Sequence, residues 1–235
     1  MKRIIYLALV CTIGLFYGCE KDSQDPSKLE YFVAFDLQGN ALELVELGTT
    51  YVDAGVRAYE NGKDVTSSVV ITGLDEISTD AAGLYTITYT ATNANGYVTS
   101  TSRSVIVYDP SITIDLSGEY SVITGTNRTN LSTGAVTAYS GYKVKLEKLV
   151  PGIYSVSDFF GGYYDKRANY GSSYAMIGYI SIKADNTIDL LQSSVAGWGD
   201  SLDQLTDGLY DPSTGVISWS AQYANAYNFN VKLSK

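Results

Sequence analysis

Apolar and polar residues alternate with a period of two through most of the chain, and from Tyr31 onward no segment carries a convincing helical stripe. The run GLYTITYTATN at 83–93 places Tyr85, Ile87 and Tyr89 on one face and mainly threonines on the other. This alternation is typical of a β-strand with one buried face. Such runs recur about every ten residues with turn residues between them, so the sequence predicts an all-β protein.

The predicted strands fall into two groups. Residues 30–109 have the strand spacing of a β-sandwich, whereas residues 116–235 contain about eight short strands and suit an antiparallel β-barrel or sandwich. The segment 110–115 between them is a short linker, because Pro110 has no N–H to donate to a strand ladder. The one helix that we expect lies at 201–207, where two leucines would share a face.

The N-terminus has the organisation of a signal peptide over residues 1–18. Lys2 and Arg3 precede an apolar run that is too short to span a bilayer comfortably. The run ends at Gly18-Cys19, which resembles the lipobox of bacterial lipoproteins, and this resemblance implies that Cys19 is acylated and becomes the mature N-terminus. The alternative is an ordinary signal peptide that happens to contain a cysteine.

Residues 19–29 are predicted to be a lipidated tether, because they are polar and contain a proline. Their acidic residues resemble the export signal of surface-exposed outer-membrane lipoproteins. That resemblance implies an outer-membrane lipoprotein, exposed at the cell surface and attached to the membrane through its lipid. An anchor that faces the periplasm is the alternative.

Composition excludes several classes of site. After signal-peptide cleavage Cys19 would be the only cysteine left, so neither disulfides nor a cysteine-based metal site can stabilise the domains. The formal net charge of −9, without a basic stripe, argues against nucleic acid as a partner.

The first domain resembles a family of bacterial immunoglobulin-like (Ig-like) domains related to hyalin repeats. The segments 48–69 and 83–107 carry the resemblance, through glycines at turns and alternating Tyr, Ala and Val positions. Arg103 also falls on this pattern. The resemblance implies an Ig-like β-sandwich that acts as a spacer or an adhesive module.

The second domain resembles the lipocalin-like C-terminal domain of lipoproteins linked to Sus-type glycan-uptake systems. The segments that carry the resemblance are 157–164, 185–191, 197–203 and 211–223. It implies a small β-barrel, and it implies glycan capture by context, without assigning a residue-level mechanism.

Gly199-Asp200-Ser201-Leu202 matches the tetrapeptide that names a large group of serine esterases. A serine at its ordinary pKa is a poor nucleophile and needs a base, yet the chain contains no histidine. The motif also lies near the C-terminus of a β domain. We therefore predict no catalytic residue and no enzymatic activity.

Metal and glycosidase chemistry are also not expected. The absence of histidine and free cysteine excludes the commonest zinc ligands. Four aspartates are closely spaced, but not with the alternation of a calcium loop; they are Asp200, Asp203, Asp207 and Asp211. A glycosidase would need a pair of carboxyl groups, and Glu147 alternates with lysines like surface charge. We predict neither a cofactor nor a metal.

The segment 158–174 gathers aromatic residues among glycines and polar residues, outside any alternating run. Rings in such loops could stack on sugars while polar neighbours bind hydroxyl groups. The predicted ligand-binding residues are Tyr163, Tyr164, Tyr170 and Trp198. The competing interpretation is that the tyrosines fill the barrel; Trp219, in an alternating run, is predicted to be core.

Two functions follow from these observations. The first is a non-catalytic surface lipoprotein whose second domain captures a glycan or another small ligand in a Sus-type uptake system. The second is a structural or adhesive accessory subunit that binds another protein of an outer-membrane complex, such as a transporter component.

Overall fold

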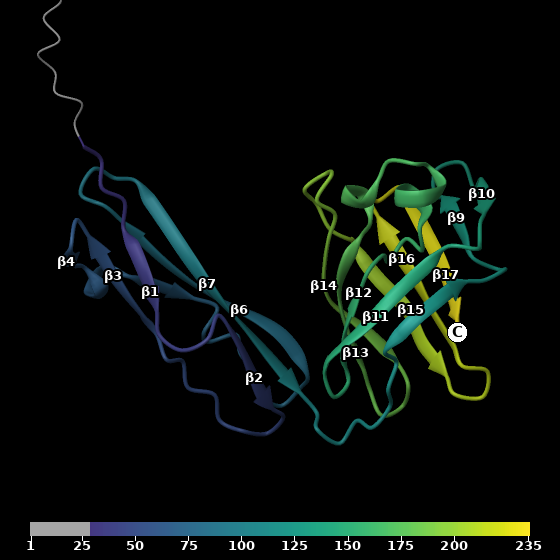
Figure 1. Cartoon of the computed structure of the whole chain (residues 1–235), viewed down its shortest axis with the longest axis horizontal. Coiled ribbons are helices and arrows are strands. Elements are labelled where there is room, and N and C mark those ends of the chain that lie inside the picture. Colours follow the sequence, from purple (N-terminus) through teal and green to yellow (C-terminus); the bar gives the residue numbers. More distant parts are fainter. Residues whose placement is uncertain (1–28) are drawn as a thin grey trace, which may run out of the picture.

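The computed structural model describes residues 29–235, which form two β-rich domains joined by a short connection (Figure 1). The predicted signal peptide (1–18), Cys19 and all but the last residue of the predicted tether lie outside the described residues. Within 29–235 no helix has the length and apolar character needed to cross a bilayer.

The first domain consists of two small sheets. One has the order β1-β3-β4 and is built from Ala34–Leu37, Val56–Glu60 and Lys63–Asp64. The other has the order β2-β7-β6-β5 and is built from Leu42–Glu46, Val98–Tyr108, Gly83–Thr92 and Val70–Thr72. A short 3-10 turn, η2 (Thr66–Ser68), follows β4. The β2–β7 pair is parallel and the others are antiparallel.

The core of the first domain follows the alternation of β6 and β7. Ile87, Tyr89, Val105 and Val107 are buried, as the period-two pattern predicts. Ile106, on the opposite face of β7, is also buried, because it packs against the second domain. The two domains therefore share a small apolar junction.

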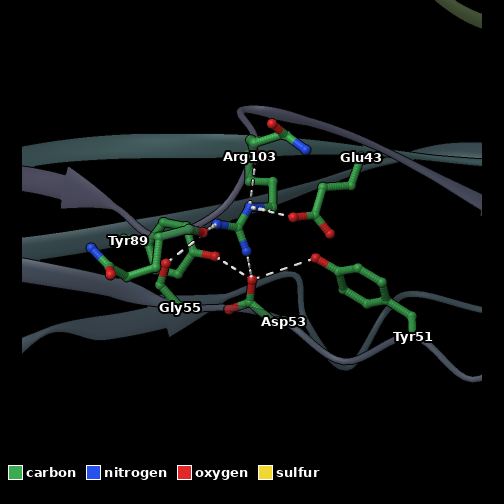
Figure 2. Close-up of polar contacts among 8 residues, drawn as sticks. Glu43, Tyr51, Asp53, Gly55, Tyr89 and Arg103 are labelled. Atoms are coloured by element: carbon green, nitrogen blue, oxygen red, sulfur yellow. Dashed lines mark hydrogen bonds and ion pairs between the residues drawn. The ribbon is translucent and has the colours of Figure 1, made fainter.

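Arg103 forms a buried ion-pair network in this core (Figure 2). Its guanidinium pairs with the Asp53 carboxylate and lies 3.8 Å from a carboxylate oxygen of Glu43. The Tyr89 hydroxyl donates to Asp53 at 2.7 Å, and the Tyr51 hydroxyl reaches the same oxygen at 3.4 Å. A buried charge needs such compensation. The polar residues of the Ig-like pattern at positions 53 and 103 therefore have a structural role in this core.

The second domain is a curled antiparallel sheet of ten strands. Eight of them follow one another as an up-and-down meander in which β17 pairs back to β8. Their bounds are β8 Gly118–Val122, β11 Lys143–Val150, β12 Ile153–Val156, β13 Ile177–Ile182, β14 Ile188–Ser194, β15 Gln204–Asp211, β16 Val216–Tyr223 and β17 Tyr227–Ser234. Between β14 and β15 the sheet is joined by a bridge from Thr187 to Leu209. The all-β fold class is confirmed.

Two further strands form a hairpin beside this meander. They are β9 (Asn127–Asn130), which pairs with the start of β17, and β10 (Val136–Ala138). The centre of the barrel is aromatic: Trp219 is buried and its indole N–H donates to the Phe159 carbonyl at 2.9 Å. The prediction that Trp219 is a core residue is confirmed.

The predicted helix at 201–207 is wrong. Residues from Gln204 onward form β15, which pairs with β16, and Leu202 is a buried loop residue whose N–H donates to the Ser193 hydroxyl at 3.0 Å. Two leucines three residues apart are compatible with a helix, but also with a buried loop residue followed by a strand. Here Leu205 belongs to β15, and the backbone hydrogen bonds between β15 and β16 stabilise the strand.

Candidate functional site

The loop between β12 and β13 covers one end of the barrel and holds two short helices (Figure 1). It is organised by Asp158, whose buried carboxylate accepts hydrogen bonds from the backbone N–H groups of Phe160 (2.9 Å), Gly162 (2.7 Å) and Met176 (3.1 Å). One side chain thus ties the start of the loop to its end.

Burial also changes the acid–base behaviour of Asp158. Removal from water disfavours the carboxylate and raises the pKa of Asp158 to about 7, although the three backbone N–H groups oppose the rise. The residue is covered by the loop that it organises, so its role is to position the loop.

Two glycines then turn the chain into the first helix. Gly161 and Gly162 have φ of 60° and 80°, values that favour glycine. A Cβ on Gly162 would lie 2.7 Å from the Cβ of Tyr142. The helices that follow are η3 (Tyr163–Arg167), with π-type hydrogen bonding, and η4 (Ser172–Tyr174).

Four rings meet at the covered end of the barrel, and we call Tyr164, Tyr170, Tyr174 and Trp198 the aromatic platform. Ring centroids lie 4.9 Å apart for Tyr164 and Trp198 and 4.8 Å apart for Tyr174 and Trp198. Tyr170 stacks on Tyr164 at 5.9 Å. The structure therefore brings together three of the predicted ligand-binding residues and adds Tyr174, which the sequence placed in the same loop without singling it out.

The platform rings differ in exposure. Tyr170 is 56% exposed and Trp198 40% exposed, as expected for rings outside strands. Tyr163 and Tyr164 are only 6% and 8% exposed, as the competing interpretation that the tyrosines fill the barrel requires. Both pack edge-on against Phe229, at 5.5 and 5.7 Å. Their part in ligand binding stays a prediction.

A glycine-flanked loop carries Trp198. The N–H of Gly197 donates to the Ser173 carbonyl at 2.7 Å, and the N–H of Gly199 donates to the Val195 carbonyl at 2.8 Å. The first of these bonds joins the Trp198 loop to η4. Trp198 is therefore held against Tyr174 by backbone hydrogen bonds.

The esterase-like tetrapeptide lies beside this loop. Asp200 accepts bonds from the Tyr223 hydroxyl at 3.0 and 2.9 Å, and burial, helped by that carboxylate, raises the pKa of Tyr223. Ser201 is exposed. Asp200 thus anchors a loop through Tyr223, which packs 5.7 Å from Trp198.

The other carboxylates that the sequence raised are also accounted for locally. Asp203 accepts from the Asn225 N–H at 2.6 Å, Asp211 accepts from the Ser213 N–H at 2.9 Å, and Glu147 pairs with Lys145 at the surface. Among residues 29–235 no three potential His, Cys, Asp or Glu ligands gather into a metal site.

A separate groove of about 450 Å³ crosses the faces of β11 to β14, lined in part by Lys145, Ile177, Tyr179 and Gln192. None of the platform rings lines it. A ligand on the platform would therefore stack on a surface, whereas a ligand in the groove would lie against the sheet.

Comparisons with known proteins agree with the two-domain organisation. Residues 35–107 match the family model of the bacterial surface protein Ig-like domain, and residues 109–235 match a family model of a C-terminal domain. The first match confirms the predicted Ig-like domain. No curated protein matches the chain.

Among solved structures, the chain is similar to the lipoprotein BT2262 from Bacteroides thetaiotaomicron. The two are 40% identical, the match covers 87% of this chain and 100% of the other, and the TM-score is 0.50.

Two structures of Clostridium perfringens ZmpB also match weakly. One holds CBM51-2 in complex with GlcNAc and INT domains (17% identity, 53% of this chain, 29% of that chain, TM-score 0.26). The other holds the M60 catalytic domain with CBM51-1 and CBM51-2 (16% identity, 55% of this chain, 14% of that chain, TM-score 0.28). These similarities are too low to support a conclusion about this chain.

Proposed function

The chain belongs to the family of the Bacteroides lipoprotein BT2262 and carries a bacterial surface Ig-like domain; from this premise we propose that it is a non-catalytic outer-membrane lipoprotein that captures a glycan. Cys19 carries the lipid and the Ig-like domain is the spacer. The second domain binds the ligand on the aromatic platform. The expected partners are a glycan and the components of a Sus-type outer-membrane transporter.

The observation that carries this proposal is the pair of exposed rings, Tyr170 and Trp198. Backbone hydrogen bonds hold the loop of Trp198 in place. An exposed aromatic face binds the apolar face of a sugar ring, and the hydroxyl and indole N–H groups supply the few polar contacts that orient it. Since Tyr164 and Tyr174 pack behind Trp198, the platform is formed before ligand arrives, which lowers the entropic cost of binding.

The surroundings of Ser201 support a binding protein over a hydrolase. The hydroxyl has no histidine to activate it, and Asp200 is already engaged by Tyr223. Asp158, whose pKa is raised, is buried, and both of its carboxylate oxygens already accept hydrogen bonds from backbone N–H groups.

A second candidate function is an accessory subunit that binds another protein. Four apolar side chains on one sheet of the Ig-like domain favour it, because they are exposed: Leu42, Leu44, Val70 and Ile71. Substituting Leu42 and Leu44 with serine should then abolish co-purification of a membrane partner and leave glycan binding unchanged.

Two experiments test the leading proposal. Mass spectrometry of the protein extracted from its native membrane should find an acylated Cys19 as the first residue, and an unacylated terminus elsewhere would refute the anchor. A glycan array probed with residues 29–235 should give specific binding, whereas an array without any bound glycan would refute the capture function.

A further inference from the structure

Arg128, on β9, lies close to two tyrosine rings. Its guanidinium carbon is 4.7 Å from the ring centroid of Tyr163 and 4.5 Å from that of Tyr227. Its register partner is Phe229, a core residue of β17. The two rings hold the guanidinium plane in a fixed position, which is the arrangement in which arginine loses least freedom when it binds a ligand.

The hydrogen-bonding capacity of Arg128 is not used up by the protein. Its Nε is buried and has no hydrogen-bond partner within the described part of the chain. A buried donor left without a partner is unusual and costs on the order of 1 to 3 kcal/mol. The residues around Arg128 therefore do not supply all of the hydrogen bonds that its guanidinium group can make.

Arg167, the last residue of η3, brings a second cation to the same ring. Its guanidinium carbon lies 5.1 Å from the Tyr163 centroid, and its Nη1 is 3.5 Å from the Tyr163 hydroxyl. The side chain is exposed. Tyr163 is therefore bordered by two guanidinium groups.

Neither cation is neutralised within residues 29–235, where no carboxylate oxygen lies within 4.0 Å of Arg128 or Arg167. Arg103, in contrast, has its charge compensated by Asp53. In a chain with a formal net charge of −9, two uncompensated guanidinium groups on one ring are a local exception. Planar guanidinium groups bind carboxylate and sulfate oxygens in pairs.

This pair of cations adjoins the aromatic platform. The centroid of Tyr163 is 5.1 Å from that of Tyr164, which in turn contacts Trp198. We propose that the captured glycan is anionic, an inference that rests on the proposed capture function. Its sugar rings stack on the platform, and a carboxylate or sulfate group of the glycan binds Arg128 and Arg167 beside Tyr163. The sequence reasoning about the platform did not include this charge, because Arg128 lies about thirty residues before the segment 158–174 and approaches Tyr163 only in the folded chain.

The test uses a glycan array on which each acidic glycan is printed beside a matched neutral one. Uronic-acid glycans are paired with their carboxyl-reduced forms and sulfated glycans with their desulfated forms, so that the two arms distinguish carboxylate from sulfate recognition. Wild-type protein should bind one acidic arm at least about tenfold more tightly than its neutral counterpart, as expected for one charge-assisted pair. Salt should weaken that binding.

Variants assign the effect to the two arginines. Arg167→Gln, at an exposed position, and Arg128→Lys, which keeps a charge but loses the planar fork, should each reduce the preference for the acidic glycan by about tenfold. Arg57→Gln, at an exposed position of the first domain, is the matched control and should change nothing. Melting curves of all three variants test whether they are folded. If Arg128→Lys unfolds, the binding measured with Arg167→Gln alone still tests the proposal.

The outcomes separate the two proposals. Equal binding of acidic and neutral partners, unaffected by the arginine variants, would overturn the anionic ligand and leave glycan capture standing. Absence of binding on every spot would overturn both. A preference for acidic glycans that survives both substitutions would also overturn the assignment of the anion to Arg128 and Arg167.

Discussion

The ring of Tyr174 occupies the space in which a side chain at position 197 would begin. An ideal Cβ on Gly197 would lie 2.6 Å from the Cδ1 and Cε1 atoms of Tyr174, closer than carbon atoms can approach. The glycine thus allows Tyr174 to pack behind Trp198, whose ring centroid is 4.8 Å away. A residue with no side chain sets the geometry of the exposed surface.

Gly197→Ala should therefore displace Tyr174 and distort the platform. We expect a loss of about 1 to 3 kcal/mol in the free energy of unfolding, as for other overpacked sites, and weaker glycan binding. Gly215→Ala, in the turn between β15 and β16, is the control: its Cβ would meet no atom within 4 Å, but its φ of 71° is strained for alanine. Chemical denaturation and glycan titration should show both variants destabilised and only the first impaired in binding; unchanged binding by Gly197→Ala would contradict this role.

Tyr164 is a structural member of the platform. It is 8% exposed and lies edge-on to Phe160, at 5.2 Å, as well as to Trp198. Tyr164→Ala should cost about 3 to 5 kcal/mol, because a large ring leaves a cavity, and should lower the melting temperature by many degrees. Tyr164→Phe keeps the ring and should melt within a few degrees of wild type. If the alanine variant melts like the phenylalanine variant, the packing described for Tyr164 is wrong.

The buried network of the Ig-like domain makes a separate prediction. Asp53→Ala leaves the Arg103 guanidinium buried with only Glu43, at 3.8 Å, as a nearby carboxylate. Removing one partner of a buried pair costs about 3 to 5 kcal/mol, so calorimetry should show the first domain unfolding at a much lower temperature. Asp75→Ala, at an exposed position, is the control. Equal melting of the two variants would show that the Arg103–Asp53 pair does not stabilise the domain.

The raised pKa of Asp158 makes stability depend on pH. Because the folded pKa, about 7, lies above the usual value of 3.8, the fold favours the protonated form. This contribution is complete below about pH 4, falls as the pH rises towards 7, and is constant above it, for a total of at most a few kcal/mol.

Asp158→Asn is neutral at every pH and should lack this slope, although it also loses an acceptor for the Gly162 N–H and is less stable throughout. Denaturant titrations at pH 4 and pH 7 measure the difference. Asp185→Asn, at an exposed carboxylate whose pKa is lowered by the Thr187 hydroxyl, should keep the wild-type slope. Parallel pH dependence in wild type and Asp158→Asn would place the pKa of Asp158 near its ordinary value.

The strands of both domains could be predicted because their alternation reports burial directly. Phe229, Val231 and Leu233 occupy one face of β17 and are buried, as period two requires. The β9–β10 hairpin could not be predicted in this way. Its strands, NRTN and VTA, have little apolar alternation, because β9 is held mainly by its backbone ladder to β17.

The candidate site was predicted only in part, for two physical reasons. Loss of alternation placed Tyr170 and Trp198 outside strands, and both are exposed. The direction of Tyr163 and Tyr164 depends on where η3 lies over the barrel, which Asp158 and the glycines decide through tertiary contacts. The burial of Arg103 could not be predicted either. A charged residue in an alternating strand is usually exposed, and nothing in the local sequence indicates its pairing with Asp53.

The central claim is that Trp198 is a binding surface, and calorimetric titration of Trp198→Ala with the tightest-binding glycan from the array tests it most directly. Because the ring is 40% exposed but also packs on Tyr164 and Tyr174, the variant should melt below wild type and remain folded at the temperature of the titration. It should bind at least about tenfold more weakly, since a stacked ring contributes a kcal/mol or more. Tyr97→Ala, at an exposed ring of the first domain, should bind like wild type. Unchanged affinity in a folded Trp198→Ala protein would contradict the account.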